Sequence, residues 1–227
     1  MSDTDIFGGG KHQVNSVIKQ AEEDIELADG STLFLAEAGQ LTYASDFEKD
    51  EVRRVKLSGQ AFFEIFENKA KPFIIETSNA SVEVTGTSFV VKESEGRTEV
   101  IVRSGSVKLK KNNELTHISL VKGEVGIASS SSEGLIKRKN EDVNYLSWMT
   151  GSFEFNSLQL EQVFELLEER YHVDINVKKS AIENCKYSAT FSDRSVDDIL
   201  AIIGESLGLT VKQNGDTYTI DGKGCQY

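Results

Sequence analysis

Apolar and polar residues alternate along the first half of the chain, from Asp24 to about Ala128. A period of two is typical of strands that bury one face, and no stretch in this half repeats at helical spacing. Gly, Asn, Asp or Ser separates nearly every run, as turns require. Strands are predicted over 25–27, 32–35, 41–43, 52–57, 61–66, 73–77, 81–85, 88–92, 98–103, 106–110, 118–121 and 124–128. Short strands without intervening helices indicate an antiparallel β-sandwich or barrel-like domain.

After Tyr145 the pattern becomes strand, helix, strand, with alternation at 153–155, helical spacing over 160–171 and alternation again at 173–177. The same order returns 36 residues later. The apolar positions that match at this offset are Phe155 with Phe191, Leu160 with Val196, Val163 with Ile199, Phe164 with Leu200, Leu167 with Ile203, Tyr171 with Leu207, Val173 with Leu209 and Ile175 with Val211. Such self-similarity marks a duplicated unit. We therefore expect a small α+β domain built from two βαβ repeats.

Capping residues predict where the two helices begin and end. Asn156 with Gln159 and Ser195 with Asp198 each place side-chain acceptors near the first amide hydrogens of a helix. Gly208 follows the second helix, where glycine commonly ends one.

Composition between these regions predicts the domain boundaries. Residues 129–144 contain a serine run and mixed charge, which cannot bury apolar area, so they are interpreted as a linker. Gly8-Gly9-Gly10 suggests a flexible or artificial leader. The predicted organisation is a disordered tail or remnant at 1–23, an all-β domain at 24–128, a linker at 129–144 and an α+β domain at 145–227.

Charge and hydropathy exclude two classes of partner. The 227 residues hold 25 Lys and Arg against 37 Asp and Glu, a net charge of −12, and residues 145–227 alone hold 7 against 13. Neither half offers the basic surface that a nucleic acid requires. No apolar run approaches the ~20 residues of a membrane helix, and the opening residues do not form a secretory signal.

The two cysteines, Cys185 and Cys225, lie 40 residues apart without metal-ligand spacing. They could form one disulfide in an oxidising compartment. Two unpaired thiols are the favoured interpretation, because two cysteines in a chain of this length do not make a disulfide scaffold.

Catalytic and cofactor motifs are missing or misplaced. Residues 204–208 fit G-x-S-x-G, yet Ser206 would close a helix and no histidine follows it, which disfavours a hydrolase. His12, His117 and His172 have no second ligand at useful spacing, and His172 suits a helix C-terminus. We expect no catalytic residues, no metal and no cofactor.

Aromatic residues are assigned first to the core. Phe62 and Phe63 are expected to be buried. Trp148 is a core residue in one interpretation and packs between the two domains in the other.

Ordered motifs across the first domain resemble the FecR-like family of transmembrane anti-sigma regulators. They are Leu27-Ala28-Asp29-Gly30-Ser31, then Val55 to Ile65, Lys71-Pro72-Phe73-Ile74-Ile75, Val84 to Val91, and Gly105-Ser106-Val107 with Leu120 to Glu124. The second domain, beginning at Trp148 to Phe155, is similar to a short secretin/TonB N-terminal-like domain. Ala28, Gln60, Val90 and Lys122 depart from the family pattern at positions with no known catalytic role.

The resemblance implies a periplasmic signal receiver. Its partner would be the periplasmic signalling domain of a TonB-dependent outer-membrane transporter, and an extracytoplasmic-function (ECF) sigma factor would bind a cytoplasmic segment. That segment and the family's inner-membrane span are expected to be absent from this chain. The alternative is a stand-alone module that binds carbohydrate or the cell envelope.

The final hairpin is the candidate contact surface. Asn214-Gly215 closes a turn, and an exposed edge strand can accept a partner strand. The candidate interface residues are Leu209, Val211, Lys212, Gln213, Asp216 and Tyr218. The alternative is an ordinary solvated edge.

Overall fold

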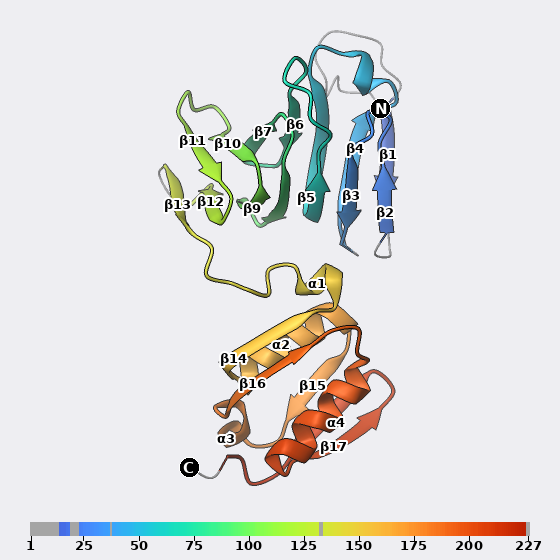
Figure 1. Ribbon diagram of the computed structural model, residues 1–227, viewed down its shortest axis with the longest axis vertical. Helices are drawn as coiled ribbons and strands as arrows, with labels where there is room; N and C mark the ends of the chain where they lie inside the picture. The colour runs from blue at the N-terminus through green and yellow to red at the C-terminus, as the bar shows by residue number, and fades with distance from the viewer. Residues whose placement is uncertain (1–13, 19–22, 37, 132–133, 226–227) are drawn as a thin grey trace. The chain divides into compact units, whose positions relative to one another are not determined.

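The chain forms two compact units, Met1–Glu141 and Asp142–Tyr227, called here the first and second units. The computed structural model describes residues 14–18, 23–36, 38–131 and 134–225 (Figure 1). The first unit consists of a nearly closed, barrel-like sheet and the second of helices with two small sheets. The predicted fold class, a β domain followed by a small α+β domain, is confirmed.

Two layers of strands share the long strand β5 (Arg53–Glu64) in the first unit. The first half of β5 pairs with β4 and β6, and the second half pairs with β3 and β8. One layer contains β1 (Val14–Ile18), β4 (Gln40–Ala44), β6 (Phe73–Glu76), β7 (Ala80–Val84), β10 (Ser106–Lys111) and β11 (His117–Val121). The other contains β2 (Glu23–Glu26), β3 (Thr32–Leu35), β8 (Ser88–Ser94), β9 (Arg97–Ser104), β12 (Glu124–Ser129) and β13 (Leu135–Lys139). A 3-10 helix, η1 (Phe47–Lys49), precedes β5.

Gly59 lies where β5 passes from one layer to the other. Its φ of +87° is in the left-handed region, and a Cβ there would meet the Cα of Gly39 at 2.9 Å. Glycine is required for both reasons. The strand therefore turns between layers at the one residue that permits it.

Three strand pairings differ from the sequence prediction. Residues 135–139 form β13 on β12, so the linker assignment of 129–144 is wrong there. The charges that suggested a linker belong to an edge strand, where Lys137 pairs with Glu124 and Arg138 with Glu99. Residues 14–18, assigned to a tail, pair with β4 as β1, while the rest of 1–22 lies outside the described residues. β5 and β6 run parallel in a sheet predicted to be antiparallel.

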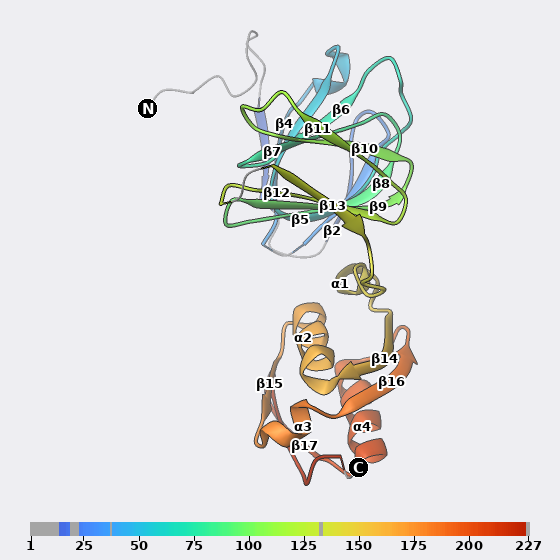
Figure 2. The same cartoon turned by 90° about the vertical axis from the view of Figure 1, so that its left-hand side faces the viewer.

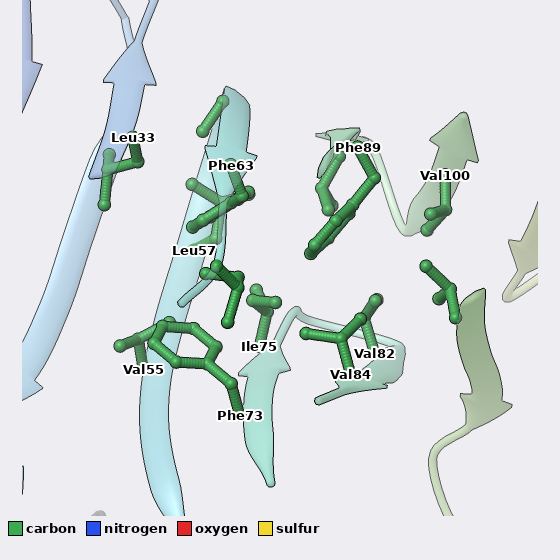
Figure 3. Packing of buried hydrophobic residues seen from close by; sticks show 14 of the residues in the cluster. Leu33, Val55, Leu57, Phe63, Phe73, Ile75, Val82, Val84, Phe89 and Val100 are labelled. Carbon is green, nitrogen blue, oxygen red and sulfur yellow. The ribbon is translucent and has the colours of Figure 1, made fainter. Parts of the chain in front are cut away.

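Alternate residues of the strands fill the space between the two layers (Figure 3). Leu33, Phe63 and Phe89 lie opposite one another across β3, β5 and β8, and the rings of Phe63 and Phe89 stack at 5.4 Å between centroids. Phe62 is also buried, but on the opposite face of β5, where the guanidinium of Arg103 lies over its ring. Burial of both phenylalanines confirms the prediction.

The second unit has helices between two small sheets. Its elements are α1 (Ser147–Thr150), β14 (Phe153–Gln159), α2 (Leu160–Tyr171), β15 (Asp174–Val177), α3 (Ser180–Glu183), β16 (Lys186–Phe191), α4 (Val196–Leu207), β17 (Thr210–Asn214) and β18 (Thr217–Asp221). β14 pairs with β16, and β18 lies between β15 and β17. Figure 2 shows α2 between β15 on one side and β14 with β16 on the other.

The two repeats coincide in the structure at the predicted offset. α2 and α4 have the same length and begin 36 residues apart, as β15 and β17 do. β14 of the first repeat pairs with β16 of the second, and β15 of the first and β17 of the second both pair with β18. One core therefore requires both repeats.

The helix starts follow the prediction in one repeat only. Ser195 Oγ accepts a hydrogen bond from the Asp198 amide at 3.1 Å, as predicted for α4. Asn156 lies within β14, so its assignment as a cap is wrong; Gln159 is the residue before α2, and it makes no side-chain capping bond. The first amide of α2, Leu160, instead donates to the carbonyl of Cys185 at 2.8 Å. A tertiary contact thus replaces the local cap.

The two helices end at equivalent left-handed residues, His172 (φ +53°) and Gly208 (φ +63°). A side chain in this region costs about 1 kcal/mol relative to glycine. We expect His172→Gly to be more stable than His172→Ala by about 1 kcal/mol, because both lose the imidazole and only alanine keeps a Cβ. Gly208→Ala should lose a similar amount, since nothing lies within 4 Å of its added Cβ. Urea unfolding followed by Trp148 fluorescence measures each difference; equal stability of the two His172 variants would contradict it.

Candidate functional site

The edge strand β17 and its neighbour β18 form the predicted hairpin. Asn214 pairs with Thr217, so the two loop residues are Gly215 and Asp216, and Gly215 has a φ of +62°. A positive φ at the first loop position is what a two-residue hairpin needs. The predicted hairpin is confirmed, with its turn centred one residue later than Asn214-Gly215.

The six predicted interface residues divide into three groups. Lys212, Gln213 and Asp216 are exposed. Leu209 and Val211 are half-buried and pack against the core of the second unit. Tyr218 is buried in the central strand, with 3% of its surface exposed, so it cannot itself present a contact surface.

The Tyr218 hydroxyl joins the hairpin to α4. It donates to Asp197 Oδ1 at 2.6 Å and accepts from Gln213 Nε2 at 2.9 Å. Burial, and then the hydrogen bond and negative charge of Asp197, raise the pKa of Tyr218 to about 12. Tyr218 therefore positions Gln213 on β17. The pattern of apolar residues gave no indication of Asp197, which lies on the polar face of its helix.

Alkaline pH should weaken the second unit through Tyr218. An unfolded tyrosine ionises near pH 10, whereas the folded hydroxyl has a pKa of about 12. The folded state therefore keeps the proton to higher pH than the unfolded state does. The contribution of the protonated hydroxyl to the free energy of unfolding is complete below about pH 10 and is lost between about pH 10 and 12. We expect the stability advantage of the natural chain over Tyr218→Phe to decline across this window in thermal melts. A constant difference between the two proteins would contradict the expectation.

The two cysteines form a disulfide, so the favoured assignment as unpaired thiols is wrong. β15 pairs with β18 in parallel, and the Lys178 amide, just after β15, donates a hydrogen bond to the Ile220 carbonyl in β18. The segments that follow the two strands therefore start side by side. Cys185 and Cys225 follow these two points, and their Cα atoms lie 5.5 Å apart. This separation suits a disulfide. Spacing along the chain could not predict a proximity that the sheet creates.

The family-like motifs of the first unit meet in a buried polar network. Arg53, 2% exposed, donates from Nη1 to Asp29 Oδ2 at 2.7 Å and to the Phe66 carbonyl at 3.1 Å, and from Nε to the Lys71 carbonyl at 3.0 Å. Ser31 Oγ donates to Asp29 Oδ2 at 2.8 Å and accepts from the Phe66 amide at 3.1 Å. The residues of L-A-D-G-S and K-P-F are thus joined through Arg53, a residue that the sequence did not single out. They have a structural role.

Two further motif glycines allow close backbone contacts in the same unit. A Cβ on Gly86 would meet Glu67 at 2.7 Å, and one on Gly105 would meet the Gly86 carbonyl at 2.7 Å. Thr87 Oγ1 donates to the Ser106 carbonyl at 2.8 Å beside them. The motifs G-T and G-S-V are therefore neighbours in space, and again the contacts are those of packing.

The remaining chemical candidates do not assemble into a site. Ser206 lies in the last turn of α4 and donates to the Ile203 carbonyl at 3.0 Å, which is not a strand-to-helix elbow. His117 begins β11, His172 follows α2, and His12 lies outside the described residues. Among the described residues, no group of three or more His, Cys, Asp or Glu could hold a metal ion.

Trp148 lies in the short helix α1 and is 5% exposed. Its indole nitrogen donates to the Tyr145 carbonyl at 3.1 Å. Its assignment to packing between the domains stays a prediction. In the part of the chain that the structure describes, no helix is long and apolar enough to cross a membrane.

Comparisons with known proteins agree with this picture. The family model for FecR protein matches residues 14–108, and that for the FecR C-terminal region matches residues 152–220. Two crystal structures of a candidate anti-sigma factor from Parabacteroides distasonis share the fold at 23% identity, with TM-scores of 0.66 and 0.67. The two matches cover 93% and 92% of this chain, and 99% and 98% of the chains in the two crystal structures. No curated protein matches the chain.

The order of the two matches along the chain is that of the two units: the FecR model lies within the all-β unit, and the C-terminal model spans β14 to β18. Similarity of the second unit to a secretin/TonB short N-terminal domain stays a prediction. Because two separate models match in their expected order and together span most of the sequence, the chain belongs to the FecR family of anti-sigma regulators.

Proposed function

We propose that this chain is the periplasmic signal-receiving region of a transmembrane anti-sigma factor. It binds the periplasmic signalling domain of a substrate-loaded TonB-dependent outer-membrane transporter. The altered contact frees an ECF sigma factor from a cytoplasmic segment that a single inner-membrane span connects to this region. In this role the chain is a binding protein and not an enzyme. The match to both FecR family models carries the proposal.

Three features of the structure support a protein-binding role. The three-stranded sheet of the second unit has an exposed edge strand, β17, which another chain can extend. The conspicuous motif residues of the first unit serve packing, through the Arg53 network. The disulfide suits an oxidising compartment such as the periplasm.

A carbohydrate-binding role has less support. Sugar-binding faces usually present aromatic rings, and among the described residues Phe66 is the one exposed aromatic side chain, at 61%. A single ring on the loop after β5 does not make a stacking surface.

Calorimetry tests the proposal directly. The purified chain is titrated with the signalling domain of the transporter encoded beside its gene, and we expect saturable binding with one site per chain. The transporter's plug domain without the signalling domain serves as the control and should not bind. Failure of every signalling domain encoded nearby to bind would overturn the proposal.

A further inference from the structure

The three-stranded sheet of the second unit has two edges, β15 and β17, that the internal repeat makes equivalent. Both strands pair with β18, and they begin 36 residues apart. An edge strand leaves every second amide and carbonyl pointing away from the sheet, and proteins commonly cover such groups. The two equivalent edges differ in whether a side chain covers them.

The β15 edge is closed by a side chain of α2. The Ile175 amide, which points away from β18, donates to Glu168 Oε1 at 2.6 Å. A carboxylate acceptor on a backbone amide makes a strong, charge-assisted hydrogen bond. An incoming strand would have to displace Glu168 to reach this position.

The β17 edge lacks this cover because of a single residue. The positions equivalent to Glu168 and Ile175 are Gly204 and Val211. Gly204 has no side chain, and a Cβ built there would lie 3.2 Å from both the Leu209 carbonyl and Val211 Cγ2. α4 lies beside β17 (Figure 1), so a side chain at position 204 would be crowded by these two atoms, and no carboxylate extends from this position to the β17 edge.

The register of the hairpin identifies the open groups. Asn214 and Thr217 close a two-residue turn, so the amides and carbonyls of Asn214, Lys212 and Thr210 face β18. Those of Val211 and Gln213 face outward. Among the described residues neither strand nor side chain pairs with these four groups.

The two-stranded sheet offers a weaker alternative. The β14 edge is closed by Asn144, whose side chain accepts from the Glu154 amide at 2.8 Å and donates to the Glu154 carbonyl at 3.0 Å. No described residue covers the β16 edge in this way, but the sheet is interrupted by a bulge between Phe155 and Leu158. Bulges twist an edge and limit strand addition.

We propose that β17 receives an extended strand of the transporter's signalling domain, through main-chain hydrogen bonds to Val211 and Gln213. This inference rests on the proposed function and specifies its contact. Side chains determine which strand fits. Val211 and Leu209 are half-buried on the inner face, which favours an apolar residue beside them, and the exposed Lys212 on the other face favours an acidic one.

Proline at position 213 tests the contact. Gln213→Pro removes an amide that faces away from β18, a substitution that edge strands tolerate. Gln213→Ala is the matched control, because it also loses the hydrogen bond to Tyr218 and keeps the amide. In calorimetry with the signalling domain, we expect Gln213→Pro to bind at least tenfold more weakly than Gln213→Ala. Melting temperatures within a few degrees of each other establish that both are folded.

Ser188→Pro removes an outward amide of β16 and tests the alternative edge. We expect its affinity to equal that of the natural chain. If Ser188→Pro weakened binding and Gln213→Pro bound as tightly as Gln213→Ala, the contact would be assigned to β16. That result would overturn the inference, while the proposed function would stand. Binding unchanged in both variants would overturn it as well.

Hydrogen exchange on the natural chain gives an answer that needs no variant. We expect the Val211 and Gln213 amides to exchange rapidly alone and at least tenfold more slowly in the complex, with Ser188 and Thr190 unaffected. Binding without this protection would contradict strand addition at β17. Absence of any binding would instead count against the proposed function itself.

Discussion

Replacing Arg53 by alanine is expected to lower the free energy of unfolding of the first unit by about 3–5 kcal/mol. The change leaves the Asp29 carboxylate, whose side chain is 6% exposed, without its cation. It also removes the donors to the Phe66 and Lys71 carbonyls and the cation over the Phe73 ring. An unpaired buried charge costs more than the ion pair contributes, which is why the loss is large. Urea unfolding followed by far-ultraviolet circular dichroism measures it.

The neighbouring residue supplies a matched control. Arg54 also forms an ion pair, with Glu76, but the two side chains are 36% and 33% exposed. A surface pair of this kind contributes about 0–1 kcal/mol, so Arg54→Ala should have little effect. If Arg53→Ala and Arg54→Ala lowered stability equally, the Arg53 network would not hold the motifs together.

Breaking the disulfide is expected to be the second large perturbation. Closing a loop of 40 residues stabilises a protein by about 4 kcal/mol in the chain-entropy description, and measured values are commonly about 2–4 kcal/mol. Cys185 is buried, so serine at that position would add the loss of an apolar contact. Reduction by dithiothreitol tests the bond without a mutation. We expect the urea midpoint of the second unit, reported by Trp148, to fall in the reduced chain.

The first unit is an internal control for reduction. Both cysteines lie in the second unit, so the urea midpoint of the first unit should not change when dithiothreitol is added. The variant Cys225→Ser should match the reduced chain and should show no further response to the reagent. A midpoint that does not move on reduction would show that the bond does not constrain the unfolded second unit.

Local patterns predicted most of the elements in both units. Alternation indicated the strands of the first unit because each buries one face against the opposite layer, and the 36-residue offset predicted α2 and α4 with their neighbouring strands. The failures have physical causes. β13 was hidden because an edge strand keeps its charged residues in solvent, and Asn156 was misassigned because a backbone carbonyl from a distant residue serves the start of α2.

The candidate site was only partly accessible from sequence. The hairpin and its exposed residues Lys212 and Gln213 could be located, since Asn-Gly and the flanking alternation are local signals. Burial of Tyr218 and its bond to Asp197 could not, because a strand residue is central or peripheral only once its neighbours are known.

The amino-acid sequence by itself determined the two-domain order, the strand and helix periods, the duplication and the family motifs, all of which depend on neighbouring residues along the chain. Only the tertiary structure decided which distant groups meet: Arg53 with Asp29, and Cys185 with Cys225. The physical reason is that sheet pairing joins segments far apart in sequence. The same pairing leaves β17 open where Gly204 replaces a capping glutamate, and no local pattern distinguishes that edge from a covered one.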